Sequence, residues 1–205
     1  AITNAKGGDG KTSGGDGIRS DKELTISGGK IEQATGGDST DGNGGYGIHS
    51  GSMLTISDSA AITNATGGSG KSGGHGLYGT AMKIISSTIG TAKGGEGKTS
   101  GGNGIYGVGK LTISDGAVIT NATGGNATLT DGTGGSGIYS DGKLTIDSAT
   151  ITNATGGTST NGTGGDGIHS GSVVKISGDT ITKATGGNAT GENSTGGSGI
   201  RSGSS

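Results

Sequence analysis

Ile-Thr-Asn-Ala-Thr-Gly-Gly, at residues 119–125, recurs with variations along this chain of 205 residues. The aliphatic residue that opens each copy follows the previous one by 27 to 32 residues, at Ile2, Ile31, Ile62, Ile89, Ile119, Ile151 and Ile181. A self-similar unit of about 20–50 residues indicates a solenoid, a propeller or another repeat array. The period therefore constrains the architecture before any single residue is considered.

Two other segments follow the opening stretch at a fixed phase. Each repeat contains Gly-Gly-x-Gly followed by Ile or Leu, and most then contain an apolar-polar-apolar triplet such as Leu144-Thr145-Ile146. Such alternation indicates strands, and the Gly, Asn, Asp and Ser between the segments indicate turns. We expect an all-β parallel β-helix (β-solenoid) of about seven coils of roughly 30 residues, with three short strands per coil. Residues 1–205 form one solenoid domain in this interpretation, a fragment of a longer repeat protein.

Glycine accounts for 54 of the residues and is regularly placed. A pair follows the first strand of every repeat, as at Gly124-Gly125, and three more glycines lie in each Gly-Gly-x-Gly segment. Glycines at fixed positions indicate positive φ or close backbone approach. A polar insert of four to eight residues separates the two clusters, and its variable length predicts a loop that protrudes from one edge of the rod.

Composition argues against several classes of function. The net charge is −2, with 14 basic and 16 acidic side chains scattered along the chain, so the basic stripe of a nucleic-acid-binding protein is missing. A membrane-spanning helix needs about 20 consecutive apolar residues, and no apolar run in this sequence approaches that length, so we expect no membrane insertion. The glycine clusters are not followed by a predicted helix, as a phosphate-binding loop requires.

Catalysis and cofactors have little support in the sequence. No set of nucleophile, base and orienting group can be assembled, so we interpret the protein as not an enzyme. A calcium-binding Gly-Gly-x-Gly-x-Asp repeat does not match, because Arg, His or Tyr replaces the Asp in all seven copies. Calcium at isolated carboxylates stays open, with turn aspartates that bond their own backbone as the alternative. The carboxylates concerned are Asp9, Asp16, Asp38 and Asp166.

The residue after each Gly-Ile or Gly-Leu forms the most suggestive set, because alternation places it on the outer face. In chain order the set is Arg19, His49, Tyr78, Tyr106, Tyr139, His169 and Arg201. Three tyrosines on successive coils predict an aromatic ladder that binds sugar rings, with the flanking cations favouring acidic sugars. The alternative is that the stacked tyrosines stabilise one another and the sheet.

Threonine columns offer a further function, since regular threonine arrays on a flat solenoid face can order water and bind ice. One column contains Thr3, Thr63, Thr120, Thr152 and Thr182, and the other contains Thr25, Thr55, Thr112 and Thr145. Glu32, Lys83 and Lys175 interrupt these columns, and threonine is also a favourable exposed strand residue. A column of Asn4, Asn64, Asn121 and Asn153 predicts a side-chain amide ladder.

Residues 137–146, Gly-Ile-Tyr-Ser-Asp-Gly-Lys-Leu-Thr-Ile, and residues 167–172, Gly-Ile-His-Ser-Gly-Ser, resemble the repeats of secreted clostridial β-helix carbohydrate-binding proteins. The resemblance implies a right-handed parallel β-helix, non-catalytic binding of plant-type polysaccharides, and bound calcium. The long glycine-rich inserts and the sparse aspartate depart from that family.

From these patterns we expect a non-catalytic structural or adhesive β-solenoid, extracellular or at the cell surface, as a surface or fibre component. Polysaccharide binding by the tyrosine ladder is the alternative, and ice binding by the threonine columns is the second. Exposed end coils are normally capped or partnered. We therefore expect end-to-end self-association or further repeats of the same chain.

Overall fold

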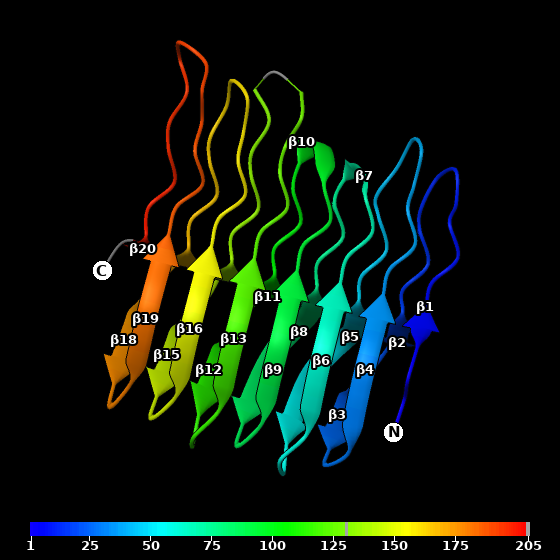
Figure 1. Cartoon of the computed structure of the whole chain (residues 1–205), viewed down its shortest axis with the longest axis vertical. Helices are drawn as coiled ribbons and strands as arrows, with labels where there is room; N and C mark the ends of the chain where they lie inside the picture. Colours follow the sequence, from blue (N-terminus) through cyan, green and yellow to red (C-terminus); the bar gives the residue numbers. More distant parts are fainter. Residues whose placement is uncertain (130, 204–205) are drawn as a thin grey trace.

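The protein is a parallel β-solenoid. A computed structural model describes residues 1–129 and 131–203, and all the strands and turns of this part of the chain belong to one all-β stack without a helix. Seven coils lie side by side, each about 30 residues after the one before (Figure 1). The expected fold class, coil number and repeat length are confirmed.

The Ile-Thr-Asn-Ala-Thr segments form a seven-stranded parallel sheet, whose strands lie in front in Figure 1. Residues of the same phase pair from coil to coil without a shift, as with Ile119 and Ile151. The strands are β1 (Ala5–Lys6), β4 (Lys30–Thr35), β6 (Ala61–Thr66), β9 (Thr88–Lys93), β13 (Val118–Thr123), β16 (Thr150–Thr155) and β19 (Thr180–Thr185).

The other two segments form an eleven-stranded sheet on the opposite side. Its strands are β2 (Ile18–Ser20), β3 (Leu24–Ser27), β5 (Ile48–Ser57), β8 (Leu77–Ile85), β11 (Ile105–Gly107), β12 (Leu111–Ser114), β14 (Ile138–Ser140), β15 (Leu144–Asp147), β17 (Ile168–Ser170), β18 (Val174–Ser177) and β20 (Ile200–Ser202). Three strands per coil is the rule, but in the second and third coils the last two segments merge into the single strands β5 and β8. The merger leaves the apolar columns in phase.

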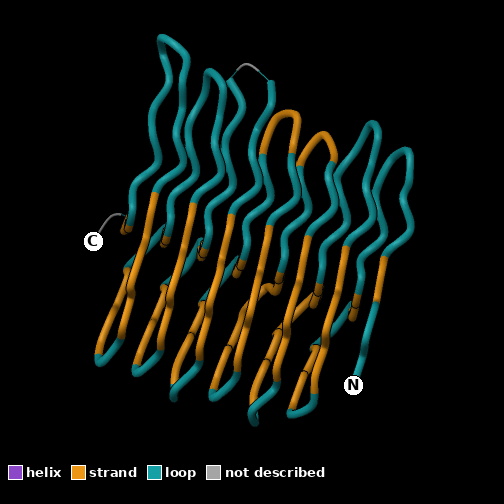
Figure 2. Tube along the Cα trace, in the orientation of Figure 1, coloured by secondary structure: helices purple, strands orange, loops and turns teal. Residues whose placement is uncertain are grey.

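The polar inserts are more ordered than the expected loop. They protrude from one edge as a row of hairpins, drawn above the sheets in Figure 2, and they too pair with their neighbours in parallel. Bridges join Ser159 to Ala189 and Thr163 to Thr195, and two inserts contain the short strands β7 (Gly70–Ser72) and β10 (Gly97–Ser100). The inserts therefore extend the solenoid as a flat fin.

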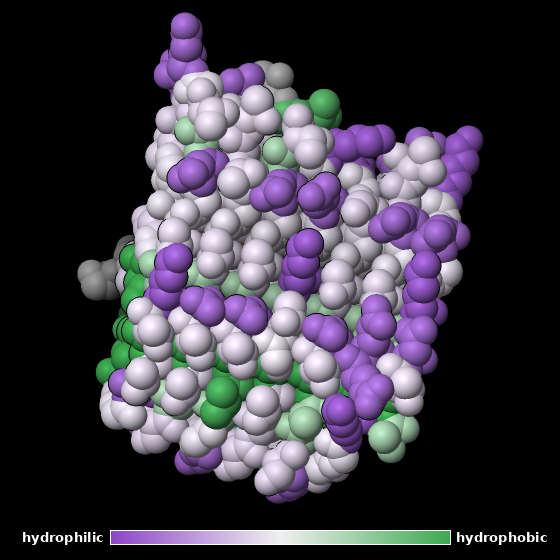
Figure 3. All heavy atoms as spheres, viewed as in Figure 1, coloured by the Kyte–Doolittle hydropathy of each residue, from purple (hydrophilic) through white to green (hydrophobic). Residues whose placement is uncertain are grey.

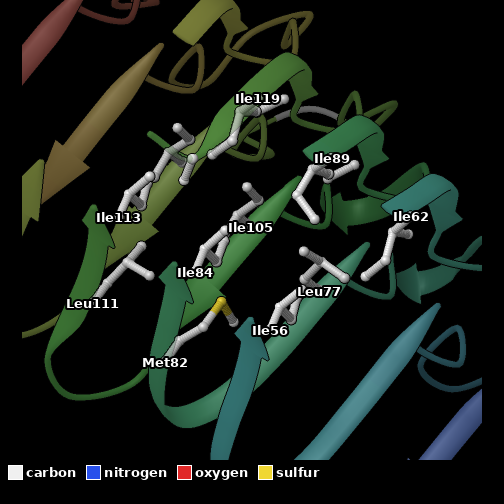
Figure 4. Packing of buried hydrophobic residues seen from close by; sticks show 14 of the residues in the cluster. Ile56, Ile62, Leu77, Met82, Ile84, Ile89, Ile105, Leu111, Ile113 and Ile119 are labelled. Atoms are coloured by element: carbon white, nitrogen blue, oxygen red, sulfur yellow. The ribbon is translucent and has the colours of Figure 1, made fainter. Parts of the chain in front are cut away.

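The apolar core lies between the two sheets and tapers toward the fin. Ile62, Ile89 and Ile119 of one sheet point toward Leu77 and Ile105 of the other, and all five are buried (Figure 4). Three residues further along each front strand an alanine fills the narrower space, at Ala34, Ala65, Ala92, Ala122 and Ala154. Beyond the alanines only glycine fits, because the two backbones meet directly.

We call the glycine-lined region between core and fin the neck. There Gly102 donates its N–H to the carbonyl of Gly95 at 2.9 Å, and Gly125 donates to Gly102 at 2.7 Å. Gly135 continues the zigzag by donating to Gly125 at 2.9 Å. The interior of the neck is thus a ladder of backbone hydrogen bonds between the two layers, which satisfies polar groups that burial would otherwise leave unpaired.

Candidate functional site

The predicted column of Arg19, His49, Tyr78, Tyr106, Tyr139, His169 and Arg201 exists in strict register. Strands β2, β5, β8, β11, β14, β17 and β20 place each of these residues opposite the next. The side chains point outward, but the rings are half-buried and only the two arginines at the ends are exposed. The reason is a second column beside them.

The second column comes from the variable position of Gly-Gly-x-Gly and was missed by the sequence analysis. Its members are Asp16, Tyr46, His75, Asn103, Ser136, Asp166 and Ser198. Several of them accept the N–H of the same position in the next coil: Asp16 from Tyr46 at 2.7 Å, His75 from Asn103 at 2.8 Å, Asn103 from Ser136 at 2.7 Å and Asp166 from Ser198 at 2.6 Å. The sequence signal was the excess of hydrogen-bond acceptors at this position.

The aromatic rings of the two columns contact one another. Tyr46 stacks on Tyr78 with ring centroids 4.8 Å apart and planes 5° from parallel, and on His75 at 5.2 Å. Tyr78 meets Tyr106 edge-on at 5.6 Å, and Tyr106 meets Tyr139 at 5.3 Å with a tilt of 47°. Aromatic pairs in these geometries stabilise a fold by about 0.5–1.5 kcal/mol beyond burial. This packing supports the alternative that the tyrosines stabilise one another.

The hydroxyl ends of two tyrosines meet Asp141, which follows β14. Tyr106 donates its hydroxyl to Asp141 Oδ2 at 2.6 Å. Burial, the hydrogen bond and the nearby carboxylate all raise the pKa of Tyr106, and the same causes raise the pKa of Tyr139 to about 12. Both side chains are therefore neutral phenols near neutral pH.

The cations at the ends of the column are paired with carboxylates. Arg19 binds Asp21 at 2.8 Å and Asp16 at 3.4 Å, and the Asp16 carboxylate also lies 2.7 Å from His49 Nδ1. At the other end Asp166 lies 2.9 Å from His169 Nδ1 and 4.0 Å from Arg201. Burial lowers the pKa of His169, with Asp166 opposing the shift. The positive charge expected to attract acidic sugars is thus balanced locally.

A groove of about 450 Å³ runs along the two columns, with lining residues from the third coil to the seventh. Its lining includes the rings of Tyr106, Tyr139 and His169, and it also includes neck glycines with Ser100, Thr133 and Thr163. His75, Asn103, Asp141, Asp166 and Arg201 also line it. Of the seven predicted site residues, Tyr106, Tyr139, His169 and Arg201 therefore share one cavity, whereas Tyr78, His49 and Arg19 lie outside it.

The four aspartates considered for calcium do not form a site together. Asp9 Oδ1 accepts the N–H of Asp38 at 2.9 Å, and Asp38 Oδ1 accepts the N–H of Ser69 at 2.6 Å. Asp16 and Asp166 accept backbone N–H groups in the same way, and both bind histidine. Across residues 1–129 and 131–203, no three His, Asp or Glu side chains converge to hold a metal ion. These carboxylates cap backbone N–H groups of the next coil, and calcium binding stays a prediction.

The threonine and asparagine columns are also in register, with interruptions. Thr25, Thr55, Thr112 and Thr145 share a column with Lys83, as the pairs of β3, β5, β8, β12 and β15 show. Asn153 donates to Asn121 Oδ1 at 3.1 Å, which confirms one rung of the predicted amide ladder. Gln33, Thr91 and Lys183 occupy the same column elsewhere. Ice binding stays a prediction.

The fold and the coil-to-coil register define the class of this molecule: a parallel β-solenoid repeat protein. Comparison with protein-family models, curated proteins and solved structures found no match. The resemblance to clostridial carbohydrate-binding repeats therefore stays a prediction. The described residues contain no helix long and apolar enough to cross a membrane.

Proposed function

We propose that this chain is a non-catalytic structural or adhesive segment, extracellular or at the cell surface. Its function is to serve as a rigid, rod-like scaffold. The observation that carries the proposal is the unshifted register of the seven-stranded sheet, in which each coil repeats the pairing of the one before. Coils that share a continuous core and contact only their neighbours give a linear scaffold that can present surfaces at a fixed spacing. The extracellular placement is drawn from the resemblance to secreted β-helix repeats.

The end coils support extension of the rod. Strands β18, β19 and β20 each pair on one side only among the described residues, and Val173, Ile176 and Ile200 are between 42% and 45% exposed. Figure 3 shows hydrophobic atoms along this edge. At the other end, Ile2, Ile18, Leu24 and Ile26 line an open apolar hollow of about 340 Å³. Further coils, from the same polypeptide or from a second copy, would cover these edges.

The two carboxylate–imidazole pairs are consistent with the non-catalytic part of the proposal. In each pair one carboxylate oxygen caps a backbone N–H of the next coil while the other binds histidine and approaches arginine. Asp16 and Asp166 are thus held by structural contacts on both oxygens. We infer that both pairs fix the ends of the aromatic column.

Two experiments test the structural proposal. Light scattering and negative-stain microscopy over a wide concentration range should find end-to-end growth, and Ile200→Glu should reduce it by placing a charge in the exposed apolar edge. Antibody labelling of intact producing cells, compared with permeabilised cells, tests the surface location. Monodisperse monomers at the highest concentration would argue against self-association, and labelling only after permeabilisation would overturn the surface assignment.

Polysaccharide binding is the second candidate, and the groove is the specific observation that favours it. Tyr106 and Tyr139 line a cavity that also offers hydroxyl groups, the combination that a sugar ring requires. Affinity for one site should be weak, so binding to a polymer will depend on avidity. The test is retention on immobilised polysaccharides. Tyr106→Ala with Tyr139→Ala should abolish retention, whereas Tyr78→Ala, in the same column but outside the groove, should preserve it; the reverse pattern would remove this site.

A further inference from the structure

The charges that line the groove are unequal. Asp141 and Asp166 contribute two carboxylates and Arg201 one guanidinium, so the ionic side chains leave a net charge of −1. The two histidines of the groove do not offset this charge near neutral pH. Burial lowers the pKa of His75 to about 4 and also lowers that of His169.

The negative charge is not spread evenly along the groove. Arg201 lies against Asp166, so these two groups balance one another at the end of the groove. Asp141 is exposed, and no ion pair in residues 1–129 and 131–203 includes it. Its hydrogen-bond donor is the neutral hydroxyl of Tyr106. The uncompensated charge therefore lies in the middle of the groove, beside the two tyrosines.

The aromatic wall at this point suits a cation as well. Tyr106 and Tyr139 are tilted by 47°, so their planes do not cover one another. The face of an aromatic ring attracts an ammonium group through its quadrupole, and a nearby carboxylate adds to the attraction. The lining also contains Ser100, Thr133 and Thr163, whose hydroxyl groups repeat once per coil.

We propose that the groove binds sugar units that carry a free primary ammonium group, with the ammonium beside Asp141 and the sugar ring against Tyr106 and Tyr139. This inference rests on the polysaccharide-binding candidate and specifies its ligand. It reverses the expected preference for acidic sugars, because Arg201 and His169 are held by Asp166 while Asp141 has no cation. A sugar is favoured over a lysine side chain because the row of hydroxyl groups provides partners for the other substituents of the ring.

The test compares three oligosaccharides of equal length: glucosamine, N-acetylglucosamine and glucose oligomers, each titrated by calorimetry at the same pH and low salt. The glucosamine oligomer should bind about fivefold to tenfold more tightly than the other two, the combined effect of a cation–π contact and a partly exposed ion pair. Asp141→Asn, which can still accept the Tyr106 hydroxyl, should remove that preference. Asp147 lies at the end of β15, the next strand along the chain, and outside the groove. Asp147→Asn should therefore leave the preference for the glucosamine oligomer unchanged.

The outcomes separate the inference from the function on which it rests. Equal binding of all three oligomers overturns the ammonium preference and leaves the polysaccharide candidate standing. Binding of none overturns both. A lysine oligomer that binds as tightly as the glucosamine oligomer, and equally depends on Asp141, overturns the assignment of a sugar. Thermal melts of the two variants show whether the fold is retained.

Discussion

At the scale of single residues, the neck requires glycine because two backbones meet where a side chain would lie. A Cβ atom built on Gly135 would lie 1.9 Å from the carbonyl oxygen of Gly102. That atom belongs to the backbone ladder and cannot move alone. One added methyl group must therefore displace the Gly102 carbonyl of the preceding coil, which accepts the N–H of Gly125, and disrupt the ladder of the neck.

Gly135→Ala should consequently destabilise the protein by at least about 3 kcal/mol, at the upper end of overpacking effects. Gly8→Ala is the matched control, because a Cβ on Gly8 would meet no atom within 4 Å and its φ is not positive. Chemical denaturation of both variants makes the comparison. Equal stability of the two would contradict the account of the neck.

His75 makes a second prediction at this scale. Its pKa is about 4 in the folded protein because of burial, against about 6.5 in an unfolded chain. Between these values the unfolded chain binds a proton that the folded chain does not. The contribution of neutral His75 to the free energy of unfolding is therefore fully present above about pH 6.5. It is lost as the pH falls toward 4, by on the order of 2–3 kcal/mol.

His75→Asn should flatten this dependence. Asparagine occupies the same column at Asn103, where its Oδ1 accepts the N–H of the next coil at 2.7 Å, so it can replace His75 Nδ1 as the cap. Denaturation measured at several pH values between 4 and 7 provides the test. If the free energy of unfolding of the variant depends on pH as steeply as that of the wild type, the proton is bound by another group.

At the scale of elements, burial depends on which coil a strand belongs to. Ile113 in β12 and Ile176 in β18 lie in one column of the eleven-stranded sheet, yet Ile113 is fully buried and Ile176 is 44% exposed. Ile113→Ala should cost about 2–5 kcal/mol, as for other buried aliphatic residues. Ile176→Ala should cost less than about 1 kcal/mol. Equal losses in denaturation experiments would mean that the last coil is covered.

The strands could be predicted from the sequence because each depends on local alternation, as in Leu111-Thr112-Ile113. The alignment of Tyr78, Tyr106 and Tyr139 could be predicted too, since one period relates them. The second column with Tyr46 and His75 was not predicted, because Asp, Tyr, His, Asn and Ser share this position and no repeated side chain marks it. No local pattern in the sequence distinguishes Tyr106 and Tyr139, which line the groove, from Tyr78, which does not.

The ordered inserts were missed for a related reason. Residues 126–133 and 188–195 read as polar loops, because nothing within one copy indicates a partner. In residues 126–129, 131–133 and 188–195, the order comes from stacking on the equivalent segments of neighbouring coils, as the pairing of Ala127 with Ser159 shows. This pairing between inserts needs the neighbouring coils, so it cannot be predicted from the sequence of one repeat.

At the scale of the whole molecule, the repeat should be removable as a unit. Deletion of residues 119–150 joins Val118 to Ile151, and each strand after the junction keeps its phase. The protein should therefore fold with one coil fewer, at somewhat lower stability because one interface between coils is lost. Circular dichroism and thermal melting check the fold, and deletion of half a repeat, which displaces the apolar columns, should prevent folding.

The distance between two spin labels tests the coil stacking most directly. The chain contains no cysteine, so Thr25→Cys and Lys175→Cys on the exposed column can be labelled uniquely. These sites are separated by five coil steps, and at about 4.8 Å per step the account predicts about 24 Å in the full chain. Removal of residues 119–150 should shorten the distance to about 19 Å. A distance that does not change after the deletion, or a broad distribution in the full chain, would contradict the solenoid.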